Sequence, residues 1–272
     1  MILGMQSLPA HWIQPDWPIH PRVRSLMTTR QGGVSAAPWD SLNLGDHVGD
    51  QVADVHSNRE RLAAHIGQRP VFLQQVHGVA SVQLGSDTPN GLAADACWSL
   101  EPGVACTIMV ADCLPVLLAD ADGRWVAAAH AGWRGLAGPS GPAASKGRGV
   151  LESLWADLER AGADVSGVMA WLGPCIGPQA FEVGPEVQAA FDDGSPEVLA
   201  LFQPTADGKF MADLAGLARV RLKALGVQAV FGNDSSPPWC TVSDSTLFFS
   251  HRRDSRSLGQ SGRMAACIWL ER

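Results

Sequence analysis

The alternation of short apolar runs with amphipathic segments is the feature of this sequence that most restricts its fold. Seven runs rich in β-branched and apolar residues are predicted strands, namely residues 23–29, 71–76, 104–110, 114–119, 125–129, 168–172 and 264–270. Four segments with helical spacing of apolar residues and a nearby glycine are predicted helices, namely residues 52–66, 150–161, 185–191 and 214–225. Because the two kinds of element are interspersed, we predict an α/β (α+β) fold, a layered sandwich of mixed β-sheets flanked by helices.

The domain organisation follows from length and from one unusual tract. A chain of 272 residues, 46% of them apolar, can form one layered domain with a large core, so we predict a single domain over residues 1–272. Residues 135–149 are dominated by Gly, Pro, Ser and Ala, a composition that does not hold a fixed element. We predict a flexible insertion at 136–148, a mobile flap inside the domain rather than a linker between two domains.

The net charge and the spacing of the cysteines restrict the classes of protein to which this chain can belong. Acidic residues outnumber basic ones by 27 to 20, and a net charge of −7 leaves no general basic face for a nucleic-acid polymer. Neither a charged leader with an apolar run nor a membrane-length apolar stretch is present, so we expect a cytoplasmic protein without a membrane partner. The six cysteines show no regular spacing, and we expect Cys97, Cys106 and Cys267 to be buried and inert. The sequence does not distinguish a monomer from a homodimer.

Three segments place metal-capable residues where predicted buried strands end. They are QQVHG at 74–78, VADCLPVLL at 110–118 and AAAHAGWRG at 127–135. Each puts its ligand-type residue, His77, Cys113 or His130, beside a turn marked by Gly or Pro, where scaffolds commonly present functional groups. Imidazole nitrogen and thiolate sulfur are zinc ligands, and a catalytic zinc uses three protein ligands and keeps one open position. The three residues are far apart in the sequence, so the predicted catalytic metal site has to be assembled by the fold.

The neighbours of these residues favour a functional site. Any one His or Cys considered alone is more readily explained as a buried core residue. However, Asp112 adjoins Cys113, Gln75 precedes His77 by two positions, and Arg134 follows His130 by four. A purely structural strand end does not need such polar groups. We therefore take Gln75, Asp112 and Arg134 as candidate substrate-binding residues.

The three ligand segments and several others together resemble the motifs of a known family. QQVHG, ADCLPVLL, AHAGWRG, LGPCIG followed by FEVG, and FFSHRRD followed by GR are similar to the motifs of the bacterial laccase-domain family, also labelled multicopper polyphenol oxidase. The resemblance runs from TTRQGGVS and SLNLGDHVGD to the terminal ACIWL. Members are read as zinc-containing purine nucleoside phosphorylases with adenosine deaminase activity, and some as peptidoglycan editing factors. The resemblance implies that His77, Cys113 and His130 bind Zn²⁺ and that the fold is a layered α/β sandwich.

The resemblance also implies the partners, a small nucleoside and phosphate. Adenosine, inosine or guanosine would give free base plus ribose 1-phosphate, and this reaction needs cationic donors for phosphate. Arg30 in TRQGG is the family-guided donor, and Asn43 is the candidate for the ribose or the phosphate. The alternative roles are structural, with Arg30 anchoring its Gly-Gly turn and Asn43 forming a cap or turn. His251 departs from the family pattern in FFSHRRD, and we expect it to be structural.

Other chemistries leave weaker signals. A multicopper oxidase needs many imidazoles, typically in His-x-His pairs, whereas this chain has eight His and no such pair. Laccase chemistry is therefore disfavoured, although Cu²⁺ in place of zinc would give weak oxidase activity. The H-x-E and P-C-x-x-C signatures of nucleobase deaminases are absent, so any deamination uses another scaffold.

Three further functions stay open. One is a cell-wall precursor amidase at the same metal site. Another is a metal-free hydrolase with Cys113 as nucleophile and His130 or His77 as base. The last is a non-catalytic metal-binding module. The metal content of the purified protein would distinguish the metal-free hydrolase from the functions that need a metal. Turnover of nucleosides would argue against the non-catalytic binding module.

Overall fold

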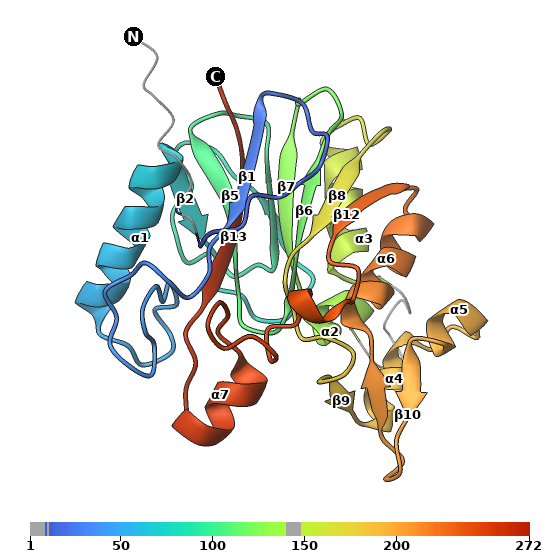
Figure 1. Cartoon of the computed structure of the whole chain (residues 1–272). Helices are drawn as coiled ribbons and strands as arrows, with labels where there is room; N and C mark the ends of the chain where they lie inside the picture. Colours follow the sequence, from blue (N-terminus) through green and yellow to red (C-terminus); the bar gives the residue numbers. More distant parts are fainter. Residues whose placement is uncertain (1–8, 10, 140–147) are drawn as a thin grey trace.

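Two large mixed sheets form the centre of the molecule (Figure 1) in the computed structural model, which describes residues 9, 11–139 and 148–272. The four-stranded sheet has the order β1 (Val23–Met27), β13 (Met264–Leu270), β5 (Val104–Val110) and β2 (Arg69–Phe72). The six-stranded sheet has the order β12 (Ala229–Gly232), β8 (Met169–Leu172), β6 (Leu114–Ala119), β7 (Val126–Ala131), β4 (Ala96–Ser99) and β3 (Ser81–Gln83). Both contain parallel and antiparallel pairs, as predicted.

The central strands are apolar along their whole length because both faces of each sheet are covered. Every residue of β5, β6, β7 and β13 is buried, which is typical of strands inside a layered structure. Ile108, Leu117 and Trp171 belong to one core cluster formed by residues of both sheets. The sheets therefore pack face to face, and the predicted sandwich is confirmed.

Helices cover the two outer faces of the sandwich. Helix α1 (Val52–Ile66) packs on the four-stranded sheet through Leu62 and Ile66. Helices α3 (Val150–Arg160) and α6 (Leu214–Ala224) cover the six-stranded sheet on the opposite side of the molecule (Figure 1). The amphipathic spacing in the sequence predicts these three helices correctly, because each buries one apolar stripe.

Shorter elements extend one end of the sandwich. They are helices α2 (Trp133–Ala137), α4 (Pro185–Phe191), α5 (Pro196–Leu199) and α7 (His251–Leu258), the 3₁₀ turn at Pro237–Trp239, and a small sheet of β9 (Glu182–Val183), β10 (Phe202–Pro204) and β11 (Phe210–Ala212). Of these, only α4 is predicted from the sequence. Strands of two or three residues carry too little periodic pattern to be recognised alone.

The predicted flexible insertion at 136–148 begins inside a helix. Leu136 and Ala137 belong to α2 and are buried, so the predicted insertion at 136–148 includes the end of a helix. Residues 140–147 lie outside the described residues. The two ends of the tract are adjacent, since a Cβ added at Gly138 would lie 2.5 Å from the carbonyl oxygen of Arg148. The chain thus leaves α2 and enters α3 at nearly the same point.

Two other expectations concern membranes and cysteines. No helix within the described ranges is both long and apolar enough to cross a bilayer. Cys97, Cys106 and Cys267 are fully buried, as predicted. Burial raises the pKa of Cys106 well above its ordinary value and the pKa of Cys267 to about 12. Both are thus protonated thiols at neutral pH, which agrees with the inert role expected for them.

Candidate metal centre

His77, Cys113 and His130 come together at one end of the two sheets. Cys113 stands in the turn between β5 and β6, and His130 lies in β7, which pairs with β6 so that His130 is opposite Pro115. His77 follows β2 on a loop. The ligand atoms of the three residues lie within 4.8 Å of one another, and the Sγ of Cys113 is 3.7 Å from the Nε2 of His77. The fold thus assembles the predicted cluster from distant segments.

The backbone around the cluster is held in unusual conformations. His77 has φ 60° and Asp112 has φ 84°, a region that residues other than glycine seldom adopt. Gly132 lies against the cluster, where an added Cβ would be 2.9 Å from the Sγ of Cys113. These turns persist because neighbouring groups hold them, and they bring the three side chains to a common point.

Asp95 is the group that orients two of the three candidate ligands. Its buried carboxylate accepts hydrogen bonds from the backbone N–H groups of Val76 (3.2 Å), His77 (2.9 Å) and Gly78 (2.7 Å). It also lies 2.8 Å from the Nδ1 of His130. With Nδ1 donating to this carboxylate, Nε2 of His130 remains free to bind a metal, an arrangement common among metal-binding histidines. Asp95 is not among the residues predicted from the sequence.

Charges in the cluster favour a thiolate beside an imidazolium when no metal is bound. Burial opposes ionisation of Cys113, but the charge and hydrogen bonds of His130 and His77 outweigh it and lower its pKa to about 6. Burial likewise disfavours a charged His130, but the Cys113 thiolate and the Asp95 carboxylate raise its pKa to about 9. Burial alone would raise the pKa of Asp95, yet the hydrogen bonds from His130 and Gly78 lower it. A divalent cation would replace the imidazolium proton as the partner of the thiolate.

The donor set and its spacing fit zinc. With Zn–N near 2.0–2.1 Å and Zn–S near 2.3 Å, tetrahedral geometry separates a nitrogen and a sulfur ligand by about 3.6 Å. The separation of 3.7 Å between Cys113 and His77 is close to this value. Across the part of the chain that the structure describes, this is the one group of three such side chains that could hold a metal. A single centre of this kind does not provide the copper cluster of a laccase.

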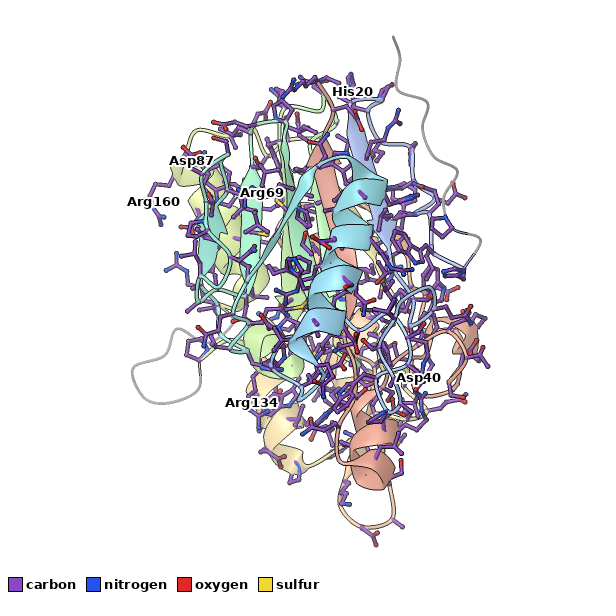
Figure 2. All side chains as sticks on the ribbon, turned by 90° about the vertical axis from the view of Figure 1, so that its left-hand side faces the viewer. His20, Asp40, Arg69, Asp87, Arg134 and Arg160 are labelled. Carbon is purple, nitrogen blue, oxygen red and sulfur yellow. The ribbon has the colours of Figure 1, made fainter. Side chains whose placement is uncertain are left out.

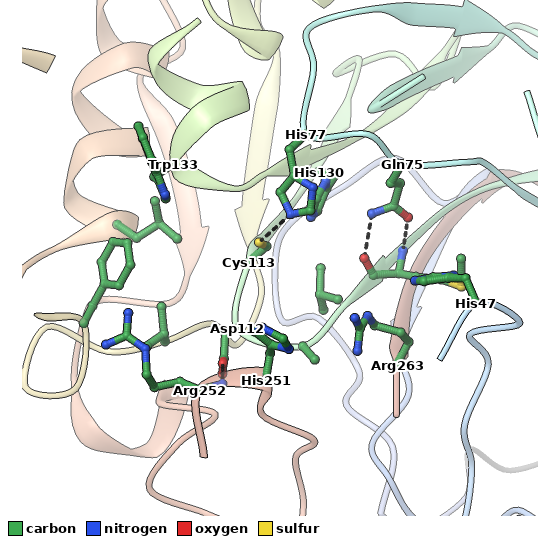
Figure 3. Close-up of a pocket in the computed structure, with 16 residues that line it drawn as sticks. His47, Gln75, His77, Asp112, Cys113, His130, Trp133, His251, Arg252 and Arg263 are labelled. Carbon is green, nitrogen blue, oxygen red and sulfur yellow. Dashed lines mark hydrogen bonds between the residues drawn. The ribbon is translucent and has the colours of Figure 1, made fainter. Parts of the chain in front are cut away.

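The cluster forms one wall of a cavity of about 300 Å³, which we call the metal pocket (Figure 3). Trp133 and Arg252 lie on one side of the three candidate ligands, while His47 and Arg263 lie on the other. The remaining lining residues are Gln75, Met109, Val110, Ala111, Asp112, Ile176, Phe181, Leu214 and His251. The pocket therefore combines a metal site, two guanidinium groups and apolar walls.

Gln75 and Asp112, two of the candidate substrate-binding residues, line the pocket, but their polar atoms are already engaged. The amide of Gln75 donates to the carbonyl oxygen of Met109 at 2.7 Å and accepts from its N–H at 2.8 Å (Figure 3). The carboxylate of Asp112 accepts from the Thr241 hydroxyl (2.5 Å), the Ser250 hydroxyl (3.0 Å) and the Arg252 N–H (2.6 Å). Both side chains thus position the walls of the pocket, and Asp112 joins the Cys113 turn to the start of α7.

Arg30 and Asn43 do not line the metal pocket, so the family-guided roles proposed for them are not supported. Arg30 donates to the carbonyl oxygens of Asp40 and Ser245 and forms an ion pair of 3.2 Å with the Asp40 carboxylate. Its guanidinium is therefore already satisfied, as in the turn-anchoring alternative. Arg134 is also outside this pocket and lines a neighbouring cavity. Figure 2 shows Asp40 and Arg134 on opposite sides of the molecule.

Asn43 acts on the pocket indirectly. It is fully buried, and its Oδ1 accepts a hydrogen bond of 2.9 Å from the backbone N–H of Arg263. The Nδ2 group donates to Asp50 at 2.9 Å, and the Leu44 N–H donates to the Arg263 carbonyl oxygen at 3.0 Å. This segment fixes the backbone of Arg263, so Asn43 positions a pocket residue rather than contacting a ligand.

Four other residues of the pocket were missed or assigned to another role. His251 lines the pocket at the start of α7, although it was expected to be structural. His47, Arg252 and Arg263 were not selected, although all three lie within the motifs quoted above. A motif shows which residues occur together but not which of them face a cavity. The only signal for these residues was that charged side chains occur within the motifs, since their position beside the ligands depends on contacts between distant segments.

The low pKa of Cys113 predicts pH-dependent reactivity in metal-free protein. The thiolate is the reactive form, and with a pKa of about 6 it predominates above pH 6 and disappears as the pH falls below it. After metal removal, alkylation of Cys113 by iodoacetamide should therefore rise with a midpoint near pH 6, well below the ordinary value of 9.0. Mass spectrometry of the labelled peptide measures this, with Cys267 as the unreactive internal control. A midpoint above pH 8 would contradict the assigned charge state.

Comparisons with known proteins agree with this architecture. The family model described as "Multi-copper polyphenol oxidoreductase laccase" matches residues 24–271. A purine nucleoside phosphorylase of Pseudomonas aeruginosa is 51% identical over 96% of this chain and 98% of its own length. The purine nucleoside phosphorylase YfiH of Escherichia coli is 44% identical over 95% of this chain and 98% of its own.

Solved structures share the fold. A Neisseria meningitidis protein assigned to DUF152 superposes with a TM-score of 0.84 at 41% identity, covering 96% of this chain and all of that one. YlmD from Geobacillus stearothermophilus superposes with a TM-score of 0.83 at 31% identity, covering 98% and 99% of the two chains. The match of the family model extends over most of the sequence, and the relatives match nearly end to end. The chain therefore belongs to the family described as multi-copper polyphenol oxidoreductase laccase.

Proposed function

We propose that this chain is a metal-dependent purine nucleoside phosphorylase that converts a nucleoside and phosphate to free base and ribose 1-phosphate. The observation that carries the proposal is the presence of Arg252 and Arg263 in the same pocket as the His77, Cys113 and His130 cluster. Such a pocket has groups for an anion beside a metal site. The names of the relatives, which are purine nucleoside phosphorylases, support the same activity.

The environment of Arg263 supports phosphate binding. Its Nη1 donates to the carbonyl oxygens of Ser261 (2.8 Å) and Gly262 (3.1 Å), and it has no ion pair with any described carboxylate. Burial lowers the pKa of Arg263, while the charges of Cys113 and Asp112 oppose that effect. A half-buried guanidinium without an ion-pair partner has an electrostatic cost that a bound anion would offset.

His47 and Arg252 complete the polar part of the pocket. Burial, together with the charge of Arg263, lowers the pKa of His47. Arg252 donates through Nη1 to the carbonyl oxygen of Ala180 at 3.2 Å, and its guanidinium lies 5.8 Å from the centre of the Phe181 ring. It too forms no ion pair within the described residues. Phosphate between the two guanidinium groups would be held by fixed donors on both sides.

The reaction follows from this placement. A phosphate oxygen attacks C1′ of the ribose as the bond from C1′ to N9 breaks, and the electron pair of that bond leaves with the purine, which takes up a proton. Arg252 and Arg263 would orient phosphate and neutralise its charge, while the apolar walls exclude water. A bound zinc would act as a Lewis acid toward an oxygen of the substrates. The same open position on the metal would support deamination of adenosine, which we include in the proposal as a second activity.

The choice of Arg263 over Arg30 as phosphate donor gives a quantitative prediction. Arg263→Gln should raise the KM for phosphate about 10- to 100-fold with a smaller effect on the nucleoside KM, because a charge-assisted contact is worth ~1.5–3 kcal/mol. Phosphate titrations of inosine cleavage measure this. Arg30→Gln is the matched control and should lower thermal stability while leaving the phosphate KM unchanged. The reverse pattern would restore Arg30 as the phosphate ligand.

The reaction itself is tested by product analysis. Chromatography of reactions with inosine, guanosine and adenosine, with and without phosphate, should show free base and ribose 1-phosphate only when phosphate is present. Equal base release without phosphate would mean hydrolysis. No base release by metal-loaded protein would favour the cell-wall amidase, and full activity of metal-free protein would favour the cysteine hydrolase.

A further inference from the structure

The two guanidinium groups of the proposed phosphate site come from the two ends of one short segment. Arg252 lies in the first turn of α7, and Arg263 directly precedes β13. Figure 3 shows them on opposite sides of the candidate metal ligands. Their separation across the pocket therefore depends on how the start of α7 is held against residues 261–263.

Asp254 joins these two places. Its carboxylate is buried and accepts a hydrogen bond of 3.0 Å from the backbone N–H of Ser250, the residue before α7. The same oxygen, Oδ2, accepts from the hydroxyl of Ser261 at 3.2 Å. The carbonyl oxygen of Ser261 accepts in turn from Nη1 of Arg263 at 2.8 Å. One side chain thus links the start of α7 to a group that holds the Arg263 guanidinium.

The same junction extends to Arg252 and to the metal site. The hydroxyl of Ser250 donates to the Asp112 carboxylate at 3.0 Å, and the backbone N–H of Arg252 donates to it at 2.6 Å. Asp112 belongs to the turn that carries a candidate metal ligand. The start of α7 is therefore fixed at that turn, and Asp254 holds residues 261–263 against it.

Arg253 neutralises Asp254, so this carboxylate does not compete for the other two arginines. The Nε of Arg253 donates to Asp254 at 2.7 Å and its Nη2 at 3.1 Å. Its guanidinium also donates to the backbone carbonyl oxygens of residues 241, 242 and 248. Arg252 and Arg263, by contrast, form no ion pair with a carboxylate in the part of the chain that the structure describes. A buried carboxylate needs a partner, and because Arg253 is that partner, both pocket arginines stay available to an anion.

Close packing holds the same junction. Phe249 is fully buried, and a Cβ added at Gly262 would lie 2.6 Å from its ring. A residue without a side chain is therefore required for residues 261–263 to lie against the segment that enters α7. This contact and the hydrogen bonds of Asp254 act on the same two segments.

We propose that Asp254 is a positioning residue for phosphate, which sets the separation of Arg252 and Arg263 across the metal pocket; this inference rests on the proposed phosphorylase function. Asp254 does not line the pocket, so it acts through the two arginines and not on the ligand. A phosphate held between two guanidinium groups needs both sets of donors in reach of its oxygens at once. Donors that are fixed in advance bind it without the cost of reorganising the site.

Asp254→Asn tests this role with little change in size. The amide has one acceptor oxygen in place of two and adds two donors, so the groups that donate to Asp254 can no longer all be satisfied. The KM for phosphate should rise about 10-fold, with a smaller effect on the KM for the nucleoside. Asp120→Asn is the matched control, because Asp120 is also a buried carboxylate bonded to an arginine but lies outside the pocket. It should lower thermal stability and leave the phosphate KM unchanged.

Ser261→Ala is a milder variant that cuts the junction at one bond. It removes the hydroxyl that donates to Asp254 and keeps the carbonyl oxygen that accepts from Arg263. The phosphate KM should rise about 5-fold, as expected for the loss of one hydrogen bond. Ser99→Ala is its control, since Ser99 is a buried serine whose hydroxyl donates to Leu84 outside the pocket. A thermal melt of each variant verifies folding.

A double-mutant cycle distinguishes positioning from general destabilisation. The separation of two donors matters only while both are present. In an Arg263→Gln background, Asp254→Asn should therefore raise the phosphate KM by less than about 3-fold, whereas independent sites would give additive effects. Additive effects would show that Asp254 does not act through the pair of arginines and would overturn the inference.

Calorimetric titration with inorganic phosphate measures the same effect without turnover. Metal-loaded Asp254→Asn should bind phosphate about 10-fold more weakly than the metal-loaded wild type and should keep its metal content. Wild-type phosphate affinity in folded Asp254→Asn and Ser261→Ala, or loss of metal from Asp254→Asn, would overturn the inference and leave the phosphorylase proposal intact. If the wild type binds phosphate but releases no base, the phosphorylase proposal fails, while weaker phosphate binding by Asp254→Asn still supports the positioning role. A wild type that binds no phosphate would overturn both.

Discussion

Cys113→Ala should remove high-affinity metal binding and abolish phosphorolysis while the protein remains folded. The substitution takes away the one anionic ligand of the candidate site and leaves His77 and His130, which cannot hold zinc with comparable affinity. Cys113 is only partly buried and lies at a strand end, so its loss removes little core packing. The expected result is near-zero metal per chain, loss of base release and a melting temperature close to that of the metal-free wild type.

Metal analysis of protein purified without added metal measures this effect. Cys267→Ala is the matched control, because Cys267 is a fully buried cysteine outside the metal pocket. It should keep its metal and activity despite some loss of stability. Stoichiometric zinc in Cys113→Ala would show that the ligand assignment is wrong. Activity of the wild type after complete metal removal would instead support the use of Cys113 as a nucleophile.

Asp95→Ala should have the second-largest effect, because it acts on both metal binding and folding. Loss of the carboxylate leaves the N–H groups of residues 76–78 and the Nδ1 of His130 without their acceptor. The Nδ1 of His130 is a buried donor, and leaving it unsatisfied costs ~1–3 kcal/mol. The free energy of unfolding should fall by about that amount, because the part-buried N–H groups of residues 76–78 can bond to water instead. Groups that orient metal-binding histidines typically contribute 10- to 100-fold in metal affinity, and we expect a loss in that range.

Asp120→Ala separates metal positioning from general stability. Asp120 is also fully buried and accepts hydrogen bonds from Arg124, but it lines no part of the metal pocket. Its removal should lower stability and leave metal affinity unchanged. Competition with a chelator gives the affinities, and urea denaturation gives the stabilities. Equal effects of Asp95→Ala and Asp120→Ala on metal affinity would mean that Asp95 does not position the site.

The sequence is sufficient to predict the layers and the three candidate ligands. The long central strands are apolar throughout, and His77, Cys113 and His130 stand at the ends of such runs. The end of a buried strand lies at one end of the sandwich, so residues at several such ends can meet there. Asp95 could not be found in this way, because its importance arises from the pairing of β4 with β7. The partners of Arg30 could not be found for a similar reason, since nothing in TRQGG shows that they are Asp40 and Ser245.

Composition also concealed local structure. Averaged over residues 135–149, the excess of Gly, Pro and Ser suggests no fixed element, yet Leu136 and Ala137 complete a buried helical turn. The charged residues of the pocket could not be located from the sequence for a different reason. Arg252 and Arg263 belong to different segments, and the hydrogen bonds made by Asp112 and Asn43 help to hold them at one cavity. These relations depend on contacts between distant segments, which a linear pattern does not contain.

The adjacency of Gly138 and Arg148 has a consequence for how far this chain tolerates changes in length. Because Gly138, after α2, lies beside Arg148, before α3, the positions of the two helices do not depend on the number of residues between them. Lengthening a connection between adjacent positions costs little loop-closure entropy, about 0.6 kcal/mol for each doubling of its length. This position is therefore suited to the insertion of a reporter domain. Such an insertion would probe the end of the molecule that carries the metal pocket without replacing a residue of that pocket.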